Sequence, residues 1–217
     1  MRSDLRAIGR GGRFGIALAC LAVLLVSCAS TGQTANADET TTTPAPPAVP
    51  AVALLAFDDP GDVAAWRTIN DPVMGGRSTS AVTFGDGGMV FSGTLSLENN
   101  GGFASARGPE DAAIGQKAAG AKSLLVRAVG DGKTYVLRVG RGGQPWSYIQ
   151  RFPTEAGVPR TYELPIAGFQ AVGMRLDPAP NAPQSLDPSG ISQVSVYILD
   201  KQQGPFELTV RGIDATG

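Results

Sequence analysis

The sequence of 217 residues contains no histidine. Catalytic arrangements that depend on imidazole, such as Ser-His-Asp and Cys-His, are therefore excluded, and so is any metal site with histidine ligands. Cysteine is almost as scarce, because Cys20 and Cys28 are the only two and both lie close to the N-terminus. The rest of the chain consequently has no disulfide and no thiol nucleophile.

Charged and aromatic residues are also few, at 17% and 6%, whereas there are 29 glycines and 16 prolines. This composition is typical of many short strands joined by turns, not of long amphipathic helices. Four of the 18 basic residues and one of the 19 acidic residues lie in the first 27 positions, which leaves 14 basic against 18 acidic residues. An acidic domain without a basic run argues against nucleic acid as a partner.

Residues 1–27 have the pattern of a secretory signal peptide. Basic residues precede Gly15–Val26, an apolar run that is too short to span a bilayer comfortably. The following Leu25-Val26-Ser27-Cys28 resembles the lipobox of bacterial lipoproteins, which implies an acylated Cys28 and a lipid anchor in the membrane. The alternatives are an ordinary cleaved signal peptide and an uncleaved anchor with a buried cysteine.

A lipid anchor would place the protein on the periplasmic or extracytoplasmic side of a bacterial envelope. Ala29 after the cysteine favours the outer membrane where the host has one. Residues 28–52 are rich in Thr, Ala and Pro, so we expect a disordered, extended tether. Residues 53–217 would then form the folded domain.

That domain is predicted to be an all-β sandwich or jelly roll of about eight to ten strands. In Met89–Leu97, for example, apolar side chains alternate with polar ones, as in a half-buried strand. Asn99-Asn100-Gly101-Gly102 follows and tolerates positive φ, which predicts a hairpin to Phe103–Arg107. Asp131-Gly132 and Gly142-Gly143 are predicted hairpin turns as well, and Asp177–Gly190 is predicted to be a surface loop.

Four motifs carry a family resemblance. They are L-E-N-N-G-G-F-A-S-A-R at 97–107, N-D-P-V-M-G-G-R-S at 70–78, L-P-I-A-G-F at 164–169 and D-K-Q-Q-G-P-F-E-L at 200–208. Together they resemble the complex I intermediate-associated protein 30 family, over roughly Leu54 to Ala215. The resemblance implies a galactose-binding-like jelly roll and a role in the assembly of respiratory complex I. Mitochondrial members work inside the organelle, however, whereas this chain carries an export signal.

Two loops are candidate partner-binding sites. Pro72 favours an extended Asp71, and Gly75-Gly76 permits a sharp reversal that would display Met74 and Arg77. The alternative is an ordered loop that packs Val73 and Met74 onto the end of the sandwich. With the exposed tip of the motif at 97–107 included, the candidate residues are Asn70, Asp71, Met74, Gly75, Gly76, Arg77, Asn99 and Asn100.

A second candidate is a ligand face for a glycan. Trp146, Tyr148 and Gln150 alternate onto one side of a predicted strand, and Arg138 on the preceding strand could join them. Aromatic planes beside amides and arginine suit a sugar ring. The alternative is that the aromatic residues belong to the core.

Carboxylates give two further hypotheses. Asp58, Asp59 and Asp214 could hold a structural calcium ion, or the aspartates could simply stabilise turns. A glycoside hydrolase would need a matched pair of carboxyl groups, and the sequence singles out no such pair. We therefore predict a non-catalytic, membrane-tethered module that binds a protein, or alternatively a glycan, with no cofactor beyond that calcium.

Overall fold

The computed structural model describes residues 50–217. The signal peptide, Cys28 and nearly all of the tether lie outside the described residues, so those predictions stay predictions. Within 50–217 no helix has the length and apolar character needed to cross a membrane.

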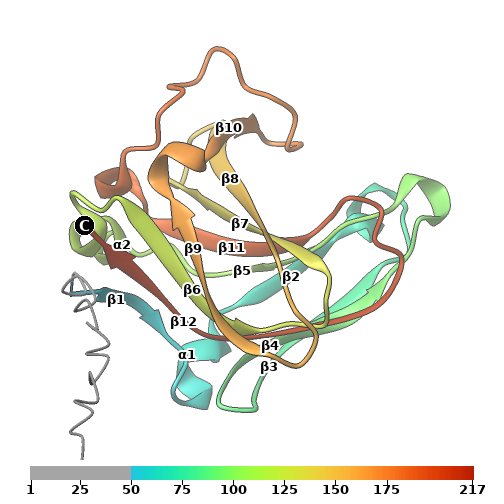
Figure 1. The fold of residues 1–217 in the computed structure, drawn as a ribbon. Helices are drawn as coiled ribbons and strands as arrows, with labels where there is room; N and C mark the ends of the chain where they lie inside the picture. Colours follow the sequence, from blue (N-terminus) through green and yellow to red (C-terminus); the bar gives the residue numbers. More distant parts are fainter. Residues whose placement is uncertain (1–49) are drawn as a thin grey trace, which may run out of the picture. The chain divides into compact units, whose positions relative to one another are not determined.

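Two six-stranded antiparallel sheets form the domain (Figure 1). Sheet A has the order β3-β4-β12-β6-β9, with β1 also paired to β12, and sheet B has the order β10-β8-β7-β11-β5-β2. Sheet A consists of β1 (Val52–Ala56), β3 (Thr79–Gly85), β4 (Gly88–Leu95), β6 (Ser123–Val129), β9 (Pro159–Pro165) and β12 (Gly204–Thr216). Sheet B consists of β2 (Arg67–Asn70), β5 (Ala104–Arg107), β7 (Thr134–Gly140), β8 (Trp146–Pro153), β10 (Gln170–Gly173) and β11 (Gln193–Ile198). The predicted all-β class is confirmed.

The longest strand, β12, organises sheet A. Its 13 residues pair with β4 over Gly204–Val210 and with β1 over Gly212–Ala215, while β6 runs along its other side. The pairing with β6 shifts register between Val210 and Gly212, which is a β-bulge. A bulge bends its strand and increases the local twist, which lets one strand serve three partners.

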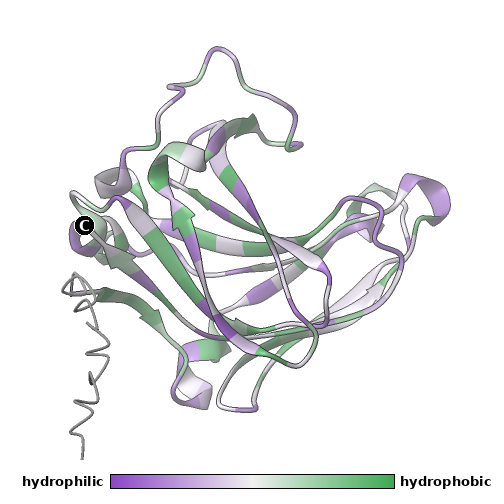
Figure 2. Cartoon of the chain, in the orientation of Figure 1, coloured by the Kyte–Doolittle hydropathy of each residue, from purple (hydrophilic) through white to green (hydrophobic). Residues whose placement is uncertain are grey.

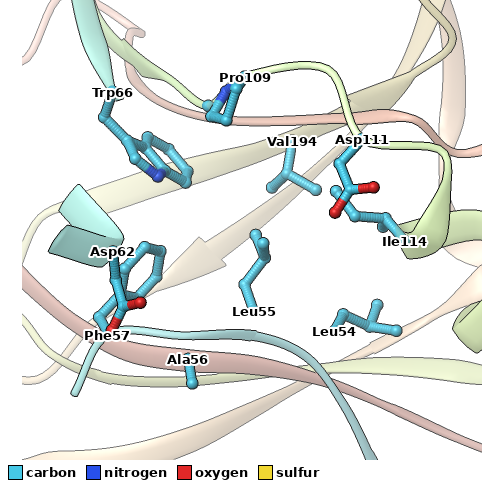
Figure 3. A pocket seen from close by; sticks show the side chains of 11 residues that line it. Leu54, Leu55, Ala56, Phe57, Asp62, Trp66, Pro109, Asp111, Ile114 and Val194 are labelled. Atoms are coloured by element: carbon cyan, nitrogen blue, oxygen red, sulfur yellow. The ribbon is translucent and has the colours of Figure 1, made fainter. Parts of the chain in front are cut away.

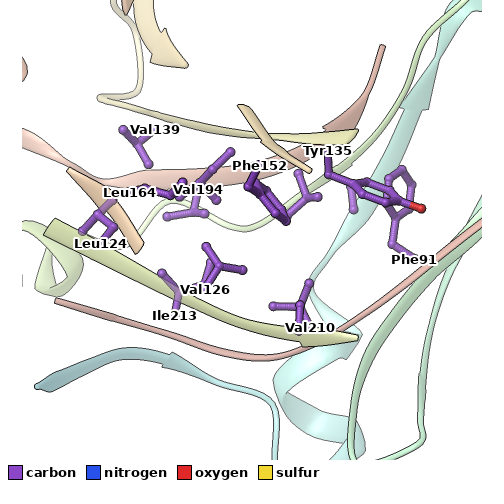
Figure 4. Packing of buried hydrophobic residues seen from close by; sticks show 14 of the residues in the cluster. Phe91, Leu124, Val126, Tyr135, Val139, Phe152, Leu164, Val194, Val210 and Ile213 are labelled. Carbon is purple, nitrogen blue, oxygen red and sulfur yellow. The ribbon is translucent and has the colours of Figure 1, made fainter. Parts of the chain in front are cut away.

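The core lies between the sheets, where apolar side chains from both inner faces meet (Figure 4). Phe91 of β4 packs on Phe206 of β12 with ring centroids 5.0 Å apart, and Phe152 of β8 packs on the partly buried Tyr162 of β9 at 5.3 Å. Figure 2 shows hydrophobic and hydrophilic residues along the strands of both sheets. Each large apolar side chain that is buried in this way stabilises the fold by about 1.5–3 kcal/mol.

Helices are short and lie in the connections. They are α1 (Pro60–Ala64), α2 (Ala113–Ala118) and the 3-10 turns η1 (Asp71–Met74), η2 (Glu98–Asn100), η3 (Ile166–Gly168) and η4 (Pro188–Gly190). A capping box begins α1, because the side chain of Asp59 accepts from the backbone of the first turn and that of Asp62 accepts from the Asp59 amide. The helix α2 lies in the connection between β5 and β6.

The predicted turns have mixed outcomes. Gly142-Gly143 does connect a hairpin, β7–β8. The hairpin predicted at Asn99–Gly102 is wrong, because β4 pairs in sheet A and β5 pairs in sheet B. Asn99 and Asn100 have the expected positive φ, 55° and 58°, but they turn a corner between the sheets. Asp131-Gly132 crosses between the sheets in the same way, from β6 to β7.

The predicted loop at 177–190 is confirmed, and Figure 1 shows it as a long excursion between β10 and β11. Two of its side chains, Ala182 and Leu186, reach the core and are buried. The loop therefore covers one end of the sandwich instead of lying only at the surface.

Candidate binding groove on the outer face of sheet B

The outer face of sheet B, which is the face turned away from sheet A, carries a second apolar cluster. Its buried members are Val136, Ile149, Val172 and Tyr197, and the partly buried Phe103, Leu176 and Leu199 pack against them. These residues alternate along their strands with side chains of the central core. In an antiparallel sandwich the outer face of a sheet is commonly polar and solvated, so an apolar cluster there marks a candidate binding surface.

Five members of this cluster form the floor of a groove with a volume of about 440 Å³, namely Phe103, Ile149, Leu176, Tyr197 and Leu199. One side of the groove is η1, which follows the edge strand β2, and the other is the segment 174–176, which follows the opposite edge strand β10. Val73 and Met74 of η1 are 71% and 63% exposed, and Met174 is 80% exposed. Three flexible or branched apolar side chains therefore stand free at the rim.

The charged residues of the groove are mainly arginines. Nε and Nη2 of Arg151 donate to the two carboxylate oxygens of Asp200, each at 2.8 Å. These hydrogen bonds lower the pKa of Asp200 against the opposing effect of burial, and they raise the pKa of Arg151. Arg107 and Arg175 also line the groove, and neither forms an ion pair with a carboxylate within residues 50–217. The groove is therefore lined mainly by apolar side chains and by positively charged arginines.

Asp71 holds the rim in place. Its carboxylate is buried and accepts hydrogen bonds from the amides of Ser78 at 2.8 Å, Gly102 at 2.6 Å and Phe103 at 3.2 Å, and from the Ser78 hydroxyl. Burial alone would raise the pKa of Asp71, but the hydrogen bonds from Ser78, Gly102 and Phe103 outweigh it and lower the pKa. A buried charge at this position is thus fully satisfied by donors from two separate loops.

The loops 70–78 and 97–107 form one unit around this carboxylate. A Cβ at Gly76 would overlap the Asp71 carboxylate, and one at Gly101 would lie 2.8 Å from its Oδ2. Across the same junction Arg77 pairs with Glu98 at 3.0 Å, and Asn99 Nδ2 donates to the Gly75 carbonyl at 3.1 Å. One glycine in each motif, Gly76 and Gly101, is therefore needed for close approach to the carboxylate.

A family model for complex I intermediate-associated protein 30 matches residues 55–210, which include both loops and the whole groove. The chain belongs to this family. Among curated proteins no match was found.

Solved structures show that the family domain shares its fold with carbohydrate-binding modules. The family 11 module of the cellulosomal cellulase Lic26A-Cel5E of Clostridium thermocellum aligns with a TM-score of 0.57 and 15% identity, over 78% of this chain and 96% of the module. A family 11 module from the same organism, in complex with a β-1,3-1,4-mixed-linked tetrasaccharide, aligns with a TM-score of 0.55 and 16% identity, over 78% and 97% of the two chains. At these identities the likeness establishes the fold alone.

The four residues of the expected ligand face do not lie on one face of the fold. Tyr148 is buried in the central core, Trp146 packs partly buried against that core, and Gln150 lies on the same inward side of β8. Arg138 points the other way, because its Nε donates to Ser147 on the outer face of sheet B. The side chains of β8 alternate as predicted, but the side that carries Trp146 and Tyr148 faces the core.

The three aspartates expected to hold calcium are likewise not brought together. Asp214 pairs with Arg127 at 2.8 Å, Asp59 caps α1, and the Asp58 amide donates to Asp62. Across residues 50–217 no group of three or more acidic, histidine or cysteine side chains is placed to hold a metal ion. The carboxylate of Asp59 therefore stabilises a helix start, and that of Asp214 stabilises a strand pair.

Other carboxylates also have structural partners. Asp131 accepts from the Tyr135 hydroxyl at 3.1 Å and from the Glu207 amide at 3.1 Å, and Glu163 accepts from the Ser123 hydroxyl at 2.8 Å. These contacts join neighbouring strands and connections. They give each carboxylate a role in the fold of the family domain.

A smaller cavity lies between β1, α1 and the segment before α2 (Figure 3). Its volume is about 250 Å³, below the range of about 300–1,000 Å³ that is usual for ligand pockets. Leu54, Phe57 and Trp66 line it, and they belong to the central core. The groove on sheet B is therefore the better candidate site.

Proposed function

We propose that this protein is a non-catalytic binding module that holds a partner protein through the groove on sheet B. The observation that carries the proposal is the set of exposed apolar side chains at the rim, Val73, Met74 and Met174, above an apolar floor. Methionine side chains adapt to irregular apolar surfaces and are common at protein-binding sites. Membership of the complex I intermediate-associated protein 30 family supports a protein partner as well.

The groove fits an apolar polypeptide segment better than a sugar ring. A sugar ring packs on the exposed face of an aromatic side chain. Of the two aromatic residues that line the groove, Tyr197 is only 2% exposed and Phe103 is partly buried. The remaining apolar contacts come mostly from Ile, Leu, Val and Met. Because Arg107 and Arg175 line the groove, charge complementarity favours a segment in which acidic residues stand next to apolar ones.

A peptide library tests this function directly. The protein is used as bait for displayed random peptides, with the double variant Met74→Asp, Met174→Asp as counter-bait and Val52→Asp as a matched control on the exposed part of β1. We expect enriched peptides that combine apolar and acidic residues, that bind the Val52 variant equally well and that fail to bind the double variant. Enrichment that is the same for all three proteins would contradict the proposal.

Glycan binding is the alternative, and one observation favours it. Although Trp146 packs against the core, it is partly exposed at the start of β8 and lines a polar cavity beside the groove, together with Gln144 and Gln193. The fold is shared with modules of which one was solved with a tetrasaccharide. Titration with mixed-linked glucan oligosaccharides should then change tryptophan fluorescence, and Trp146→Ala should abolish the change; a flat response would exclude this ligand.

The proposal includes a lipid anchor at Cys28, which would hold the groove near a membrane surface. Its support is the lipobox pattern and the Thr/Ala/Pro-rich tether in the sequence. We expect the mature protein to carry an acyl mass on Cys28 and to fractionate with membranes, and Cys28→Ser to release it. A soluble, unacylated wild-type protein would refute the anchor and leave the groove to be tested separately.

A further inference from the structure

We propose that Arg107 and Arg138 form a binding site for a carboxylate group on the outer face of sheet B. The two residues lie on different strands, β5 and β7, and both are the direct cross-strand partners of Ser195 on β11. Direct partners in an antiparallel sheet point to the same side. The two guanidinium groups therefore stand on either side of one serine, on the face that carries the groove.

The fold holds both guanidinium groups in place. Nε of Arg138 donates to Ser147 Oγ at 2.7 Å and its Nη1 donates to the Tyr197 hydroxyl at 3.3 Å, while Nε of Arg107 donates to Ser105 Oγ at 3.4 Å. The guanidinium carbons lie 5.5 Å and 6.0 Å from the centroid of the Tyr197 ring. Ser105, Ser147 and Ser195 are buried beneath them. The arginines are thus preorganised, with guanidinium N–H groups left over for a ligand.

These two positive charges have no counter-charge within ion-pair distance among residues 50–217. Arg77, Arg127, Arg151 and Arg160 each pair with a carboxylate there, but Arg107 and Arg138 do not. Glu110 lines the same cavity and its carboxylate lies against Gly142, beyond 4 Å from both arginines. Half-buried cations on an aromatic ring without an anion favour an anionic ligand.

The cavity around the arginines has a volume of about 150 Å³, which suits a small planar group such as a carboxylate and not a whole sugar chain. Arg107 lines this cavity and also the apolar groove, so the two lie next to each other. The ligand that matches both is a polypeptide whose acidic side chain reaches the arginines while its apolar neighbours lie in the groove. This identification of the ligand rests on the function proposed above.

The test uses two peptides that differ in one group, acetyl-Leu-Leu-Glu-Leu-Leu-amide and its glutamine counterpart. Binding is followed by NMR through the Nε–Hε signals of the arginines and the methyl signals of Met74 and Met174. We expect the glutamate peptide to shift both arginine signals and to bind about tenfold more tightly than the glutamine peptide. Arg107→Gln and Arg138→Gln should each remove most of that difference, whereas Arg160→Gln, an exposed arginine of sheet A, should keep it.

The possible outcomes distinguish a failure of the carboxylate site from a failure of the proposed protein ligand. Equal affinity of the two peptides, with shifts only at Met74 and Met174, would refute it and leave the proposed function intact. Binding of glucuronate at the arginines, with no peptide bound, would assign the site to acidic glycans instead. If sodium acetate shifts both arginine signals but neither peptide shifts the methionines, the carboxylate site stands and the proposed protein ligand fails. Arg107→Lys and Arg138→Lys, which keep the charge, serve as folded variants if a glutamine variant unfolds.

Discussion

Replacing Asp71 by asparagine removes a charge from the centre of the groove rim and leaves the side-chain size nearly unchanged. In the folded protein Asp71 Oδ2 accepts from the amides of Gly102 and Phe103, and Oδ1 accepts from the amide of Ser78. An asparagine has only one acceptor oxygen. In either orientation its NH₂ group faces at least one of these amide hydrogens, so a buried donor loses its partner.

The size of the effect follows from the number of donors affected. A hydrogen bond to a charged group contributes about 1.5–3 kcal/mol, and a buried donor without a partner costs about 1–3 kcal/mol. We expect Asp71→Asn to lower the free energy of unfolding by about 3 kcal/mol, and Asp71→Ala by about 4 kcal/mol because all four hydrogen bonds are lost. A domain of this kind has a total stability of about 5–15 kcal/mol, so either change is large.

The effect should depend on pH in a defined direction. The pKa of Asp71 in the folded protein is lowered, because hydrogen bonds outweigh the effect of burial. A lowered folded-state pKa means that the charge contributes its full stabilisation above the unfolded pKa of about 3.9, and that this contribution is lost as the pH falls through the folded pKa. The difference in unfolding free energy between wild type and Asp71→Asn should therefore stay constant from about pH 8 to pH 5 and shrink below about pH 4.

Urea unfolding followed by tryptophan fluorescence measures this, since Trp66 and Trp146 are the two tryptophans of the chain. The control is Asp86→Asn, at the exposed turn between β3 and β4, where the positive φ of 51° suits asparagine as well as aspartate. The reasoning is refuted if Asp71→Asn is as stable as Asp86→Asn at pH 7. If the difference in unfolding free energy between wild type and Asp71→Asn does not shrink in acid, the charge of Asp71 is not the cause of that difference.

Three further substitutions test other parts of the structure. Gly76→Ala places a methyl group against the Asp71 carboxylate and should cost about 2–3 kcal/mol in thermal unfolding, whereas Gly190→Ala meets no atom within 4 Å and should change stability by less than about 0.5 kcal/mol. Phe91→Ala opens a cavity against Phe206 and should cost about 3–5 kcal/mol in urea; a loss below about 1 kcal/mol would contradict the packing of the core. Arg151→Ala breaks a solvent-exposed pair, so screening limits its cost to about 0.5–1 kcal/mol, and NMR titration should show the pKa of Asp200 rising at least to its ordinary value.

Sequence periodicity predicted which side chains share a face, and it could not predict which face is buried. In β8, Trp146 and Tyr148 alternate with Ser147 and Ile149, and both sides contain apolar residues. Tyr148 enters the central core while Ile149 joins the outer cluster, because β8 is covered on both faces. A strand with two covered faces has no polar side to orient it.

The path of the connections between strands also could not be predicted from local sequence preferences. Asn99 and Asn100 adopt the positive φ that their residue types favour, yet local preference does not decide which strand the chain pairs with next. That choice depends on β12, a distant strand that occupies the edge of β4. The role of Asp71 was hidden for the same reason, since its donors Gly102 and Phe103 come from a later loop.

The position of β12 between β4, β1 and β6 has a consequence for biogenesis. All of its partners precede it in the chain. During synthesis the edges of β4 and β6 therefore remain unpaired until residues 204–216 leave the ribosome. Before that moment the hairpin β3–β4 is complete, but the larger sheet consists of three parts, which are β3–β4, β6–β9 and the single strand β1, and their open edges attract other chains. Loss of β12 by proteolysis or premature termination would therefore divide the sheet through its middle. Loss of an edge strand, in contrast, would only make the sheet narrower.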